Sequence, residues 1–181
     1  MADIQKLILI AIGPDQVGLV QKISEFINER GGNIEDSRMV VMVGEFALML
    51  LVSGSAGSLR QISESTSQLS AQTGLQISTK SPTARRVVEP SIPYRLVSSC
   101  MDHPGVVRKL SSAVSAHGAN IESMETQTYA APITGAPIFQ MEAVITVPAR
   151  VNINKLRAAF EEMERDENIN IDLELITRSA E

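Results

Sequence analysis

The sequence contains a long internal repeat, in which residues 13–20 recur as residues 100–107, 87 positions later. Over the 25 positions from Asp15 to Met39, nine residues are identical at this offset, where chance would give about one or two. The nine are Asp15, Gly18, Val20, Lys22, Ser24, Gly31, Asn33, Ile34 and Glu35. A chain of 181 residues is therefore expected to hold two small domains of one kind, each with its own core.

The spacing of apolar residues predicts two helices in each copy. In the first helix, apolar residues three and four positions apart are shared: Leu19, Val20, Ile23, Phe26 and Ile27 correspond to Val106, Val107, Leu110, Ala113 and Val114. In the second helix, at an offset of 94, Leu59, Ile62, Thr66 and Leu69 correspond to Ile153, Leu156, Phe160 and Met163. Each helix thus has one apolar face.

Runs of apolar and β-branched residues bounded by Gly, Ser or Pro predict four strands in each copy. The predicted strands are 6–12, 33–43, 46–52 and 75–79 in the first copy, and 94–101, 120–129, 138–147 and 169–176 in the second. The order strand, helix, strand, strand, helix, strand predicts an α+β fold of two ferredoxin-like βαββαβ domains. Each would be a four-stranded antiparallel sheet with two helices on one face.

The segment Ser81–Pro93 contains three prolines, has no clear periodicity and is expected to connect the two domains. We therefore expect an N-terminal domain over residues 1–86, with the connection starting at about residue 81, and a C-terminal domain over residues 87–181. The offset between the copies changes from 87 to about 93 across Ala130–Pro137. This insertion predicts a longer hairpin loop than the Gly44-Glu45 turn of the first copy.

Two predicted strands of the first copy, Leu7–Ile12 and Met39–Val43, are apolar at successive positions. Such strands suit sheets that are covered on both faces. Because the two helices would cover only one face, we expect the second face or an edge strand to pack against the other copy or another chain, since monomers rarely expose large apolar patches. A homodimer is the expected assembly.

The composition argues against several classes of function. A net charge of −5 and an aromatic content of 3% disfavour direct binding to nucleic acid, which needs basic residues and stacking rings. The apolar run Leu7–Ile12 is too short to span a bilayer and lacks the features of a signal peptide, so no membrane association is expected. The single cysteine, Cys100, is expected to be a buried small residue in a cytoplasmic protein.

Both copies carry Asp-x-x-Gly between the first strand and the first helix, at Asp15 and Gly18 and again at Asp102 and Gly105. A helix start offers free backbone N–H groups and the positive end of the helix dipole, and glycine permits close approach. A small carboxylate could therefore bind there.

Gly-x-Asn follows the same helix in both copies and ends at Asn33 and Asn120. The side-chain amide has a donor and an acceptor, so it could address both the carboxylate and the ammonium of an amino acid. Structural roles are the alternative for all these residues. The aspartates could cap the helix, and Gly18 and Gly105 could relieve the packing of the helix against the strand. Gly31 and Gly118 could be left-handed helix caps, and the asparagines could be turn residues.

The repeat resembles the ACT domain, a small-molecule regulatory module of amino-acid metabolism, twice over nearly the whole chain. Three segments, Asn33–Arg38, Gly44–Phe46 and Leu50–Ser55, look more narrowly like the glycine cleavage system transcriptional repressor family, whose members are stand-alone pairs of ACT domains. The resemblance implies amino-acid sensing, with ligands held between the first loop of one ACT domain and the second strand of its partner. It also implies regulation by contact with a DNA-binding activator.

The resemblance implies a set of ligand-binding residues in each copy. They are Asp15, Gln16, Val17, Gly18, Leu19 and Asn33 in the first copy, and Asp102, His103, Pro104, Gly105, Val106 and Asn120 in the second. Val17 stands where ACT loops commonly have Pro, and both copies have Asp where amino-acid-binding relatives often have Asn. A carboxylate there would repel that of the ligand unless it faced the ammonium. The copies are unequal, with Val17 in the first and Pro104 and a longer hairpin in the second, so we expect that one copy binds while the other supplies an interface.

The sequence predicts no catalytic residues, no metal and no cofactor. Residues 13–18 contain no Arg or Lys to hold a phosphate, no Cys-x-x-Cys loop is present, and His103 and His117 lie at opposite ends of a predicted helix. The predicted function is non-enzymatic: the chain senses an amino acid, glycine or serine, and contacts a DNA-binding regulator. The alternatives are a regulatory subunit of an amino-acid-metabolic enzyme and an assembly module without a ligand.

Overall fold

The computed structural model describes residues 4–83 and 89–177. The chain divides into two compact units, Met1–Ala84 and Arg85–Glu181. The boundary that we expected at residue 86, together with Arg85 and Arg86 of the predicted connection, lies outside the described residues. Each unit is described separately below.

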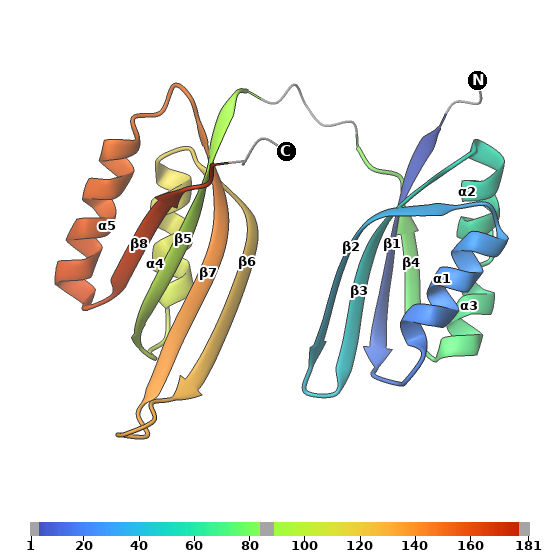
Figure 1. Ribbon diagram of the computed structural model, residues 1–181, viewed down its shortest axis with the longest axis horizontal. Coiled ribbons are helices and arrows are strands. Elements are labelled where there is room, and N and C mark those ends of the chain that lie inside the picture. The colour runs from blue at the N-terminus through green and yellow to red at the C-terminus, as the bar shows by residue number, and fades with distance from the viewer. Residues whose placement is uncertain (1–3, 84–88, 178–181) are drawn as a thin grey trace. The chain divides into compact units, whose positions relative to one another are not determined.

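The N-terminal unit is a four-stranded antiparallel sheet in the order β2-β3-β1-β4. Its elements are β1 (Gln5–Pro14), α1 (Leu19–Glu29), β2 (Asn33–Met42), β3 (Glu45–Gly54), α2 (Ala56–Glu64), α3 (Thr66–Thr73) and β4 (Gln76–Lys80). The helices lie together on one face of this sheet (Figure 1).

The C-terminal unit repeats this topology, with strand order β6-β7-β5-β8. Its elements are β5 (Ser91–Met101), α4 (Val106–Ala116), β6 (Asn120–Ala130), β7 (Pro137–Pro148), α5 (Ile153–Glu167) and β8 (Asn170–Leu175). The predicted α+β fold of two ferredoxin-like βαββαβ units is therefore confirmed.

The core of the N-terminal unit lies between its sheet and its helices. Alternate strand residues and one face of each helix are buried, including Leu7, Leu9, Ala11, Ile23, Phe26, Leu48, Leu50, Val52, Ile62 and Leu69. Successive side chains of a strand point to opposite faces, so the remaining apolar residues of β1 and β3 lie on the face without helices. Within the described unit, the second apolar face is therefore left uncovered.

Both first helices end in the same glycine-dependent cap. Gly31 follows α1 with φ of 72° and Gly118 follows α4 with φ of 70°. The next N–H group, that of Gly32 or Ala119, donates to a carbonyl five residues back, at 3.0 and 3.1 Å respectively. This is the Schellman arrangement, and the interpretation of these glycines as left-handed helix caps is confirmed.

The second helix of the N-terminal unit differs from the prediction, because it is broken into α2 and α3 at Ser65. The N–H of Ser65 is shared between the carbonyls of Gln61 and Ile62, at 3.1 and 3.3 Å. The Thr66 hydroxyl donates to the carbonyl of Ser63 at 3.2 Å. Ser and Thr side chains compete in this way for the backbone groups of a helix. The equivalent helix of the C-terminal unit, α5, contains no Ser or Thr and is continuous.

The β2–β3 turn of the first copy lies one residue earlier than predicted. It consists of Val43 and Gly44, whose φ values of 51° and 83° match a type I′ hairpin turn, and Glu45 already belongs to β3. The equivalent loop of the C-terminal unit spans residues 131–136 and is longer, as the insertion predicted.

The strand β5 begins at Ser91, so the end of the predicted connection is part of the sheet. The carbonyl of Pro93 accepts a hydrogen bond from the N–H of Ile176 at 3.0 Å, and regular pairing with β8 starts at Tyr94. An N–H group at Pro93 would therefore point toward the end of β8, beyond the regular pairing of the two strands. This explains how a proline is tolerated in a central strand.

Candidate ligand-binding site

The loop after the first strand enters the helix through a glycine with positive φ in both units. Gly18 has φ of 88° and Gly105 has φ of 97°, each directly before the first helical residue. Other residues are strained in this conformation, whereas glycine is not. A Cβ built on either glycine would meet no atom within 4 Å. The glycines therefore serve the backbone conformation, and the packing role considered for them is wrong.

No side chain caps the first turn of α1 or α4. Asp15 and Asp102, considered as caps, hold the loop through their backbone instead. The Asp15 N–H donates to the Gly44 carbonyl at 2.8 Å, and the Asp102 N–H donates to the Pro137 carbonyl at 2.9 Å. Each helix start thus has no side-chain acceptor for its N–H groups and directs its positive dipole end at the loop, which favours a bound anion.

A surface hollow lies beside each of these helix starts. The N-terminal hollow, of about 290 Å³, is lined by Asp15, Gln16, Gly18, Leu19, Val20, Gln21, Met39, Val41 and Phe46. The C-terminal hollow, of about 660 Å³, is lined by Asp102, His103, Gly105, Val106, Val107, Arg108, Ser111, Thr128 and Phe139. Eight of the nine positions correspond between the copies, so the repeat builds the same hollow twice.

The two hollows differ in charge. Asp15 is the charged residue among those that line the N-terminal hollow, whereas Asp102 shares the C-terminal hollow with Arg108 and His103. The Asp102 Oδ2 accepts a hydrogen bond from the Thr128 hydroxyl at 3.5 Å. The Arg108 guanidinium has no ion pair or hydrogen bond within the described part of the chain. The C-terminal hollow thus offers a carboxylate and an unpaired cation beside one helix start.

A second carboxylate near the C-terminal hollow, that of Glu167 in α5, is already neutralised. Its Oε2 lies 2.5 Å from the Nζ of Lys109. The hydrogen bond from Lys109 is the main reason that the pKa of Glu167 lies below its usual value, and His103 adds a smaller effect. Lys109 is therefore paired with Glu167, whereas Arg108 remains available to a ligand.

The described residues show little sign of other chemistry. Over residues 4–83 and 89–177, no group of three or more His, Cys, Asp or Glu could hold a metal ion, and no helix is long and apolar enough to cross a membrane. Cys100 is buried, as predicted. Desolvation, and to a lesser extent Asp102, raise the pKa of its thiol, which makes it a poor nucleophile.

Comparison with known proteins identifies the family. Residues 5–80 match the family model described as the ACT domain. The glycine cleavage system transcriptional repressors of Escherichia coli (strain K12) and Shigella flexneri are each 28% identical to the chain over 155 residues, which cover 85% of the chain and 81% of the repressor. The chain is an ACT-domain protein. It is homologous to these repressors, and the resemblance noted in the sequence is confirmed.

Two solved structures share the fold over nearly the whole chain. An unknown protein from Galdieria sulphuraria is 30% identical, with a TM-score of 0.84, and the match covers 97% of this chain and all of that one. A candidate glycine cleavage system transcriptional repressor is 20% identical with a TM-score of 0.69, over 97% of this chain and 99% of that one, and it shares the fold.

Eight of the twelve residues predicted to bind a ligand line the hollow of their own ACT domain, and four do not. Val17 is fully exposed, at 103%, and Pro104 also points to solvent. Asn33 and Asn120 open β2 and β6, whereas the hollows are lined from positions near the other ends of these strands. Six residues of strand, roughly 20 Å, separate Asn33 from Met39. One ACT domain alone does not bring the asparagines to the helix start.

The sequence analysis missed lining residues that come from the helix and from neighbouring strands. They are Val20, Gln21, Met39, Val41 and Phe46 in the first ACT domain, and Val107, Arg108, Ser111, Thr128 and Phe139 in the second. One signal was available. Phe46 and Phe139 are identical at the offset of 93 that holds beyond the hairpin insertion.

Proposed function

We propose that this ACT-domain protein senses a free amino acid and passes the signal to a DNA-binding regulator by protein contact, without catalysis and without binding DNA itself. The observation that carries the proposal is the hollow that recurs beside an uncapped helix start in both copies. Homology to repressors named for the glycine cleavage system supports a small amino acid, glycine or serine, as the ligand.

The C-terminal hollow is the better site for a zwitterion. Arg108 and the N–H groups at the start of α4 would hold the carboxylate, while Asp102 would face the ammonium and thus attract rather than repel the ligand. The N-terminal hollow has Gln21 where the other has Arg108, so we expect it to bind more weakly. Asn33 and Asn120 would contribute only from a neighbouring ACT domain.

The expected affinity is modest. Charge-assisted hydrogen bonds contribute about 1.5–3 kcal/mol each and a helix dipole about 0.3–1 kcal/mol, against the entropy lost on association. A net binding free energy of about −4 to −7 kcal/mol corresponds to dissociation constants from millimolar to roughly ten micromolar. Such a range suits the sensing of an abundant metabolite.

A thermal-shift screen of the full chain against the free amino acids tests the ligand. Glycine or serine should raise the melting temperature, because a ligand that binds only the folded state stabilises it. Arg108→Gln, which copies the residue of the first ACT domain, should abolish most of this rise. Arg165→Gln, an exposed arginine of α5 outside the hollow, is the matched control and should respond like the unmodified chain.

Two results would contradict parts of the proposal. If no amino acid stabilises the chain, it is an assembly module without a ligand. If affinity capture from lysate, with and without glycine, recovers an amino-acid-metabolic enzyme and no transcription regulator, the chain is instead a regulatory subunit of that enzyme. Recovery of a DNA-binding regulator whose capture depends on the ligand is the expected outcome.

A further inference from the structure

The sheet of the N-terminal unit has an apolar face on the side away from its helices. The apolar residues of this open face are Ile8, Ile10, Ile12, Val40, Met42, Ala47, Met49 and Leu51. Cross-strand pairs, such as Ile10 with Met49 and Ile12 with Ala47, join these side chains into one continuous patch. Met49 is 48% exposed and Ile12 is 47% exposed. A patch of this kind on a soluble domain marks an interaction surface.

The same face of the C-terminal sheet is mostly polar, although its backbone and register are equivalent. Arg95, Ser99, Gln127, Gln140 and Glu142 stand at the positions of Ile8, Ile12, Val40, Ala47 and Met49. Arg95 donates to both carboxylate oxygens of Glu142, at 2.7 and 3.0 Å. The fold therefore does not require an apolar face, and the apolar character of the N-terminal face calls for a separate cause.

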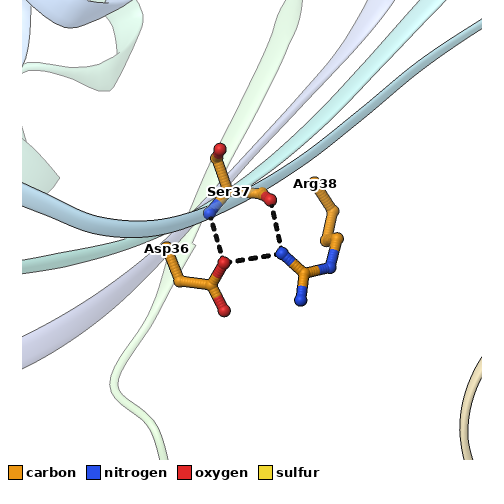
Figure 2. A network of polar contacts seen from close by, with 3 residues as sticks. All are labelled: Asp36, Ser37 and Arg38. Carbon is orange, nitrogen blue, oxygen red and sulfur yellow. Dashed lines mark hydrogen bonds and ion pairs between the residues drawn. The ribbon is translucent and has the colours of Figure 1, made fainter. Parts of the chain in front are cut away.

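The border of the N-terminal open face carries positive and negative charges in equal number, and four of the charged residues form two ion pairs. Figure 2 shows Asp36 accepting hydrogen bonds from the N–H of Ser37 and from Arg38, at 2.8 and 2.6 Å. Asp36 and Arg38 pair across the strands with Leu51 and Met49, so both lie on the open face. A second ion pair joins Lys6 to Glu35 at 2.7 Å. Lys80, beside Ile8, and Glu45, at the β2–β3 turn, also lie on this face and carry opposite charges. The positive and negative charges along the border are therefore equal in number, and an approaching surface meets little net charge.

We propose that the open face of the N-terminal sheet binds the same face of a second copy of the chain, as a symmetric dimer. A two-fold axis brings identical patches together, which suits an apolar centre with a nearly neutral border. A charged partner, such as the equivalent C-terminal face of another copy, would lose hydration of groups like Arg95 and Glu142 against apolar side chains. The second N-terminal face is therefore the occupant that the chemistry favours.

The size of the face is adequate for this contact. Four strands about 4.8 Å apart and about eight residues long give a plan area of roughly 500 Å², before the relief of the side chains is counted. Two such faces together bring about 1,000 Å², which is the lower bound for a specific interface, and the polar residues of β4 form part of the rim. Two such sheets would stack about 10 Å apart, as in a β-sandwich. The two ligand hollows lie on the helix side, so this inference is independent of the proposed function.

Sedimentation of the full chain over a wide concentration range tests the dimer. The unmodified chain should sediment as a dimer, and Met49→Lys should raise its dissociation constant at least about tenfold, because symmetry places the new charge in the interface twice. Ile10→Lys and Val97→Lys form a matched pair, since the two residues are equivalent in the two sheets. Only Ile10→Lys should weaken the dimer. Melting curves followed by circular dichroism check that each variant folds.

Specific outcomes would overturn the inference. An unmodified chain that is monomeric at every concentration excludes the dimer. A folded Met49→Lys variant that remains as dimeric as the unmodified chain shows that the copies meet elsewhere, for example through the outer edge of β2. Equal weakening by Val97→Lys would also count against it, because that substitution leaves the N-terminal face unchanged. Met49→Leu, which keeps the face apolar, should retain the dimer.

Discussion

Gln21 and Arg108 occupy the same place in the two ACT domains, the third residue after the glycine that precedes the first helix. Each lines the hollow of its own domain. This one difference gives the C-terminal hollow a guanidinium and leaves the N-terminal hollow with a neutral amide. The repeat has therefore produced one scaffold with two electrostatic characters, and exchanging these residues should exchange the binding behaviour.

Gln21→Arg should create a second glycine or serine site in the N-terminal hollow. A charge-assisted hydrogen bond of about 1.5–3 kcal/mol corresponds to a gain in affinity of roughly tenfold to a hundredfold. Titration calorimetry should show one strong site in the unmodified chain and two in the variant. Gln61→Arg adds the same charge on α2, away from the hollow, and should add no site. A double variant, Gln21→Arg with Arg108→Gln, that binds nothing would contradict the assignment.

Gly32→Ala should destabilise the N-terminal domain by about 1–3 kcal/mol through overcrowding. A Cβ at Gly32 would lie 2.8 Å from the Ile62 side chain, 2.9 Å from that of Ile27 and 3.0 Å from that of Val52. The C-terminal domain carries Ala119 at this position, so the backbone tolerates alanine and the cost is one of packing. Urea denaturation measures the change, and a neutral result would show that these neighbours move aside freely.

Val43→Asn should stabilise the chain by about 1 kcal/mol, because it relieves a strained turn. Val43 has φ of 51° and is fully exposed, at 105%, so a β-branched residue sits in the left-handed region without any gain from burial. Asparagine is favoured at this position of a type I′ turn. Val17→Asn is the matched control, since Val17 is equally exposed but has no positive φ. The urea midpoint of Val17→Asn should barely change. Equal increases in the midpoints of both variants would mean that the loss of an exposed valine alone explains the stabilisation.

Much of the fold was predictable because the same pattern of apolar residues and turns occurs twice in the sequence. Apolar spacing gave the first helix of each copy, and the strands were found to within a few residues at their ends. The break at Ser65 was not predictable from spacing, since Leu59, Ile62 and Leu69 remain on one helical face while hydroxyl groups compete for the backbone. Spacing describes which residues are buried, not whether the backbone between them is continuous.

The candidate site was predictable only in part. Sequence proximity gave the loop residues, because the loop and the helix start are one segment. Arg108 and Thr128 were missed because they reach the hollow from the helix and from the neighbouring strand β6, and a single sequence does not reveal which strand neighbours lie beside a loop. That Asn33 and Asn120 bind a ligand remains a prediction, and it requires a neighbouring ACT domain. The length of β2 separates Asn33 from the hollow of its own domain.

Acid should destabilise the C-terminal domain partly through Glu142. Its pKa lies below the ordinary value of 4.5, chiefly because Arg95 donates hydrogen bonds to its carboxylate. A carboxyl group whose pKa is lowered by folding contributes stability above its unfolded-state pKa, and this contribution is lost as the pH falls through the folded-state value. The loss should therefore begin near pH 4.5 and continue below it. Glu142→Gln removes the titrating group, so urea midpoints measured between about pH 6 and pH 3 should fall less steeply in the variant than in the unmodified chain.

Glu161→Gln, at a carboxylate of α5 without an ion pair in the described part of the chain, should keep the original slope. Identical slopes for all three proteins would mean that Arg95 and Glu142 are equally well solvated in the folded and unfolded states.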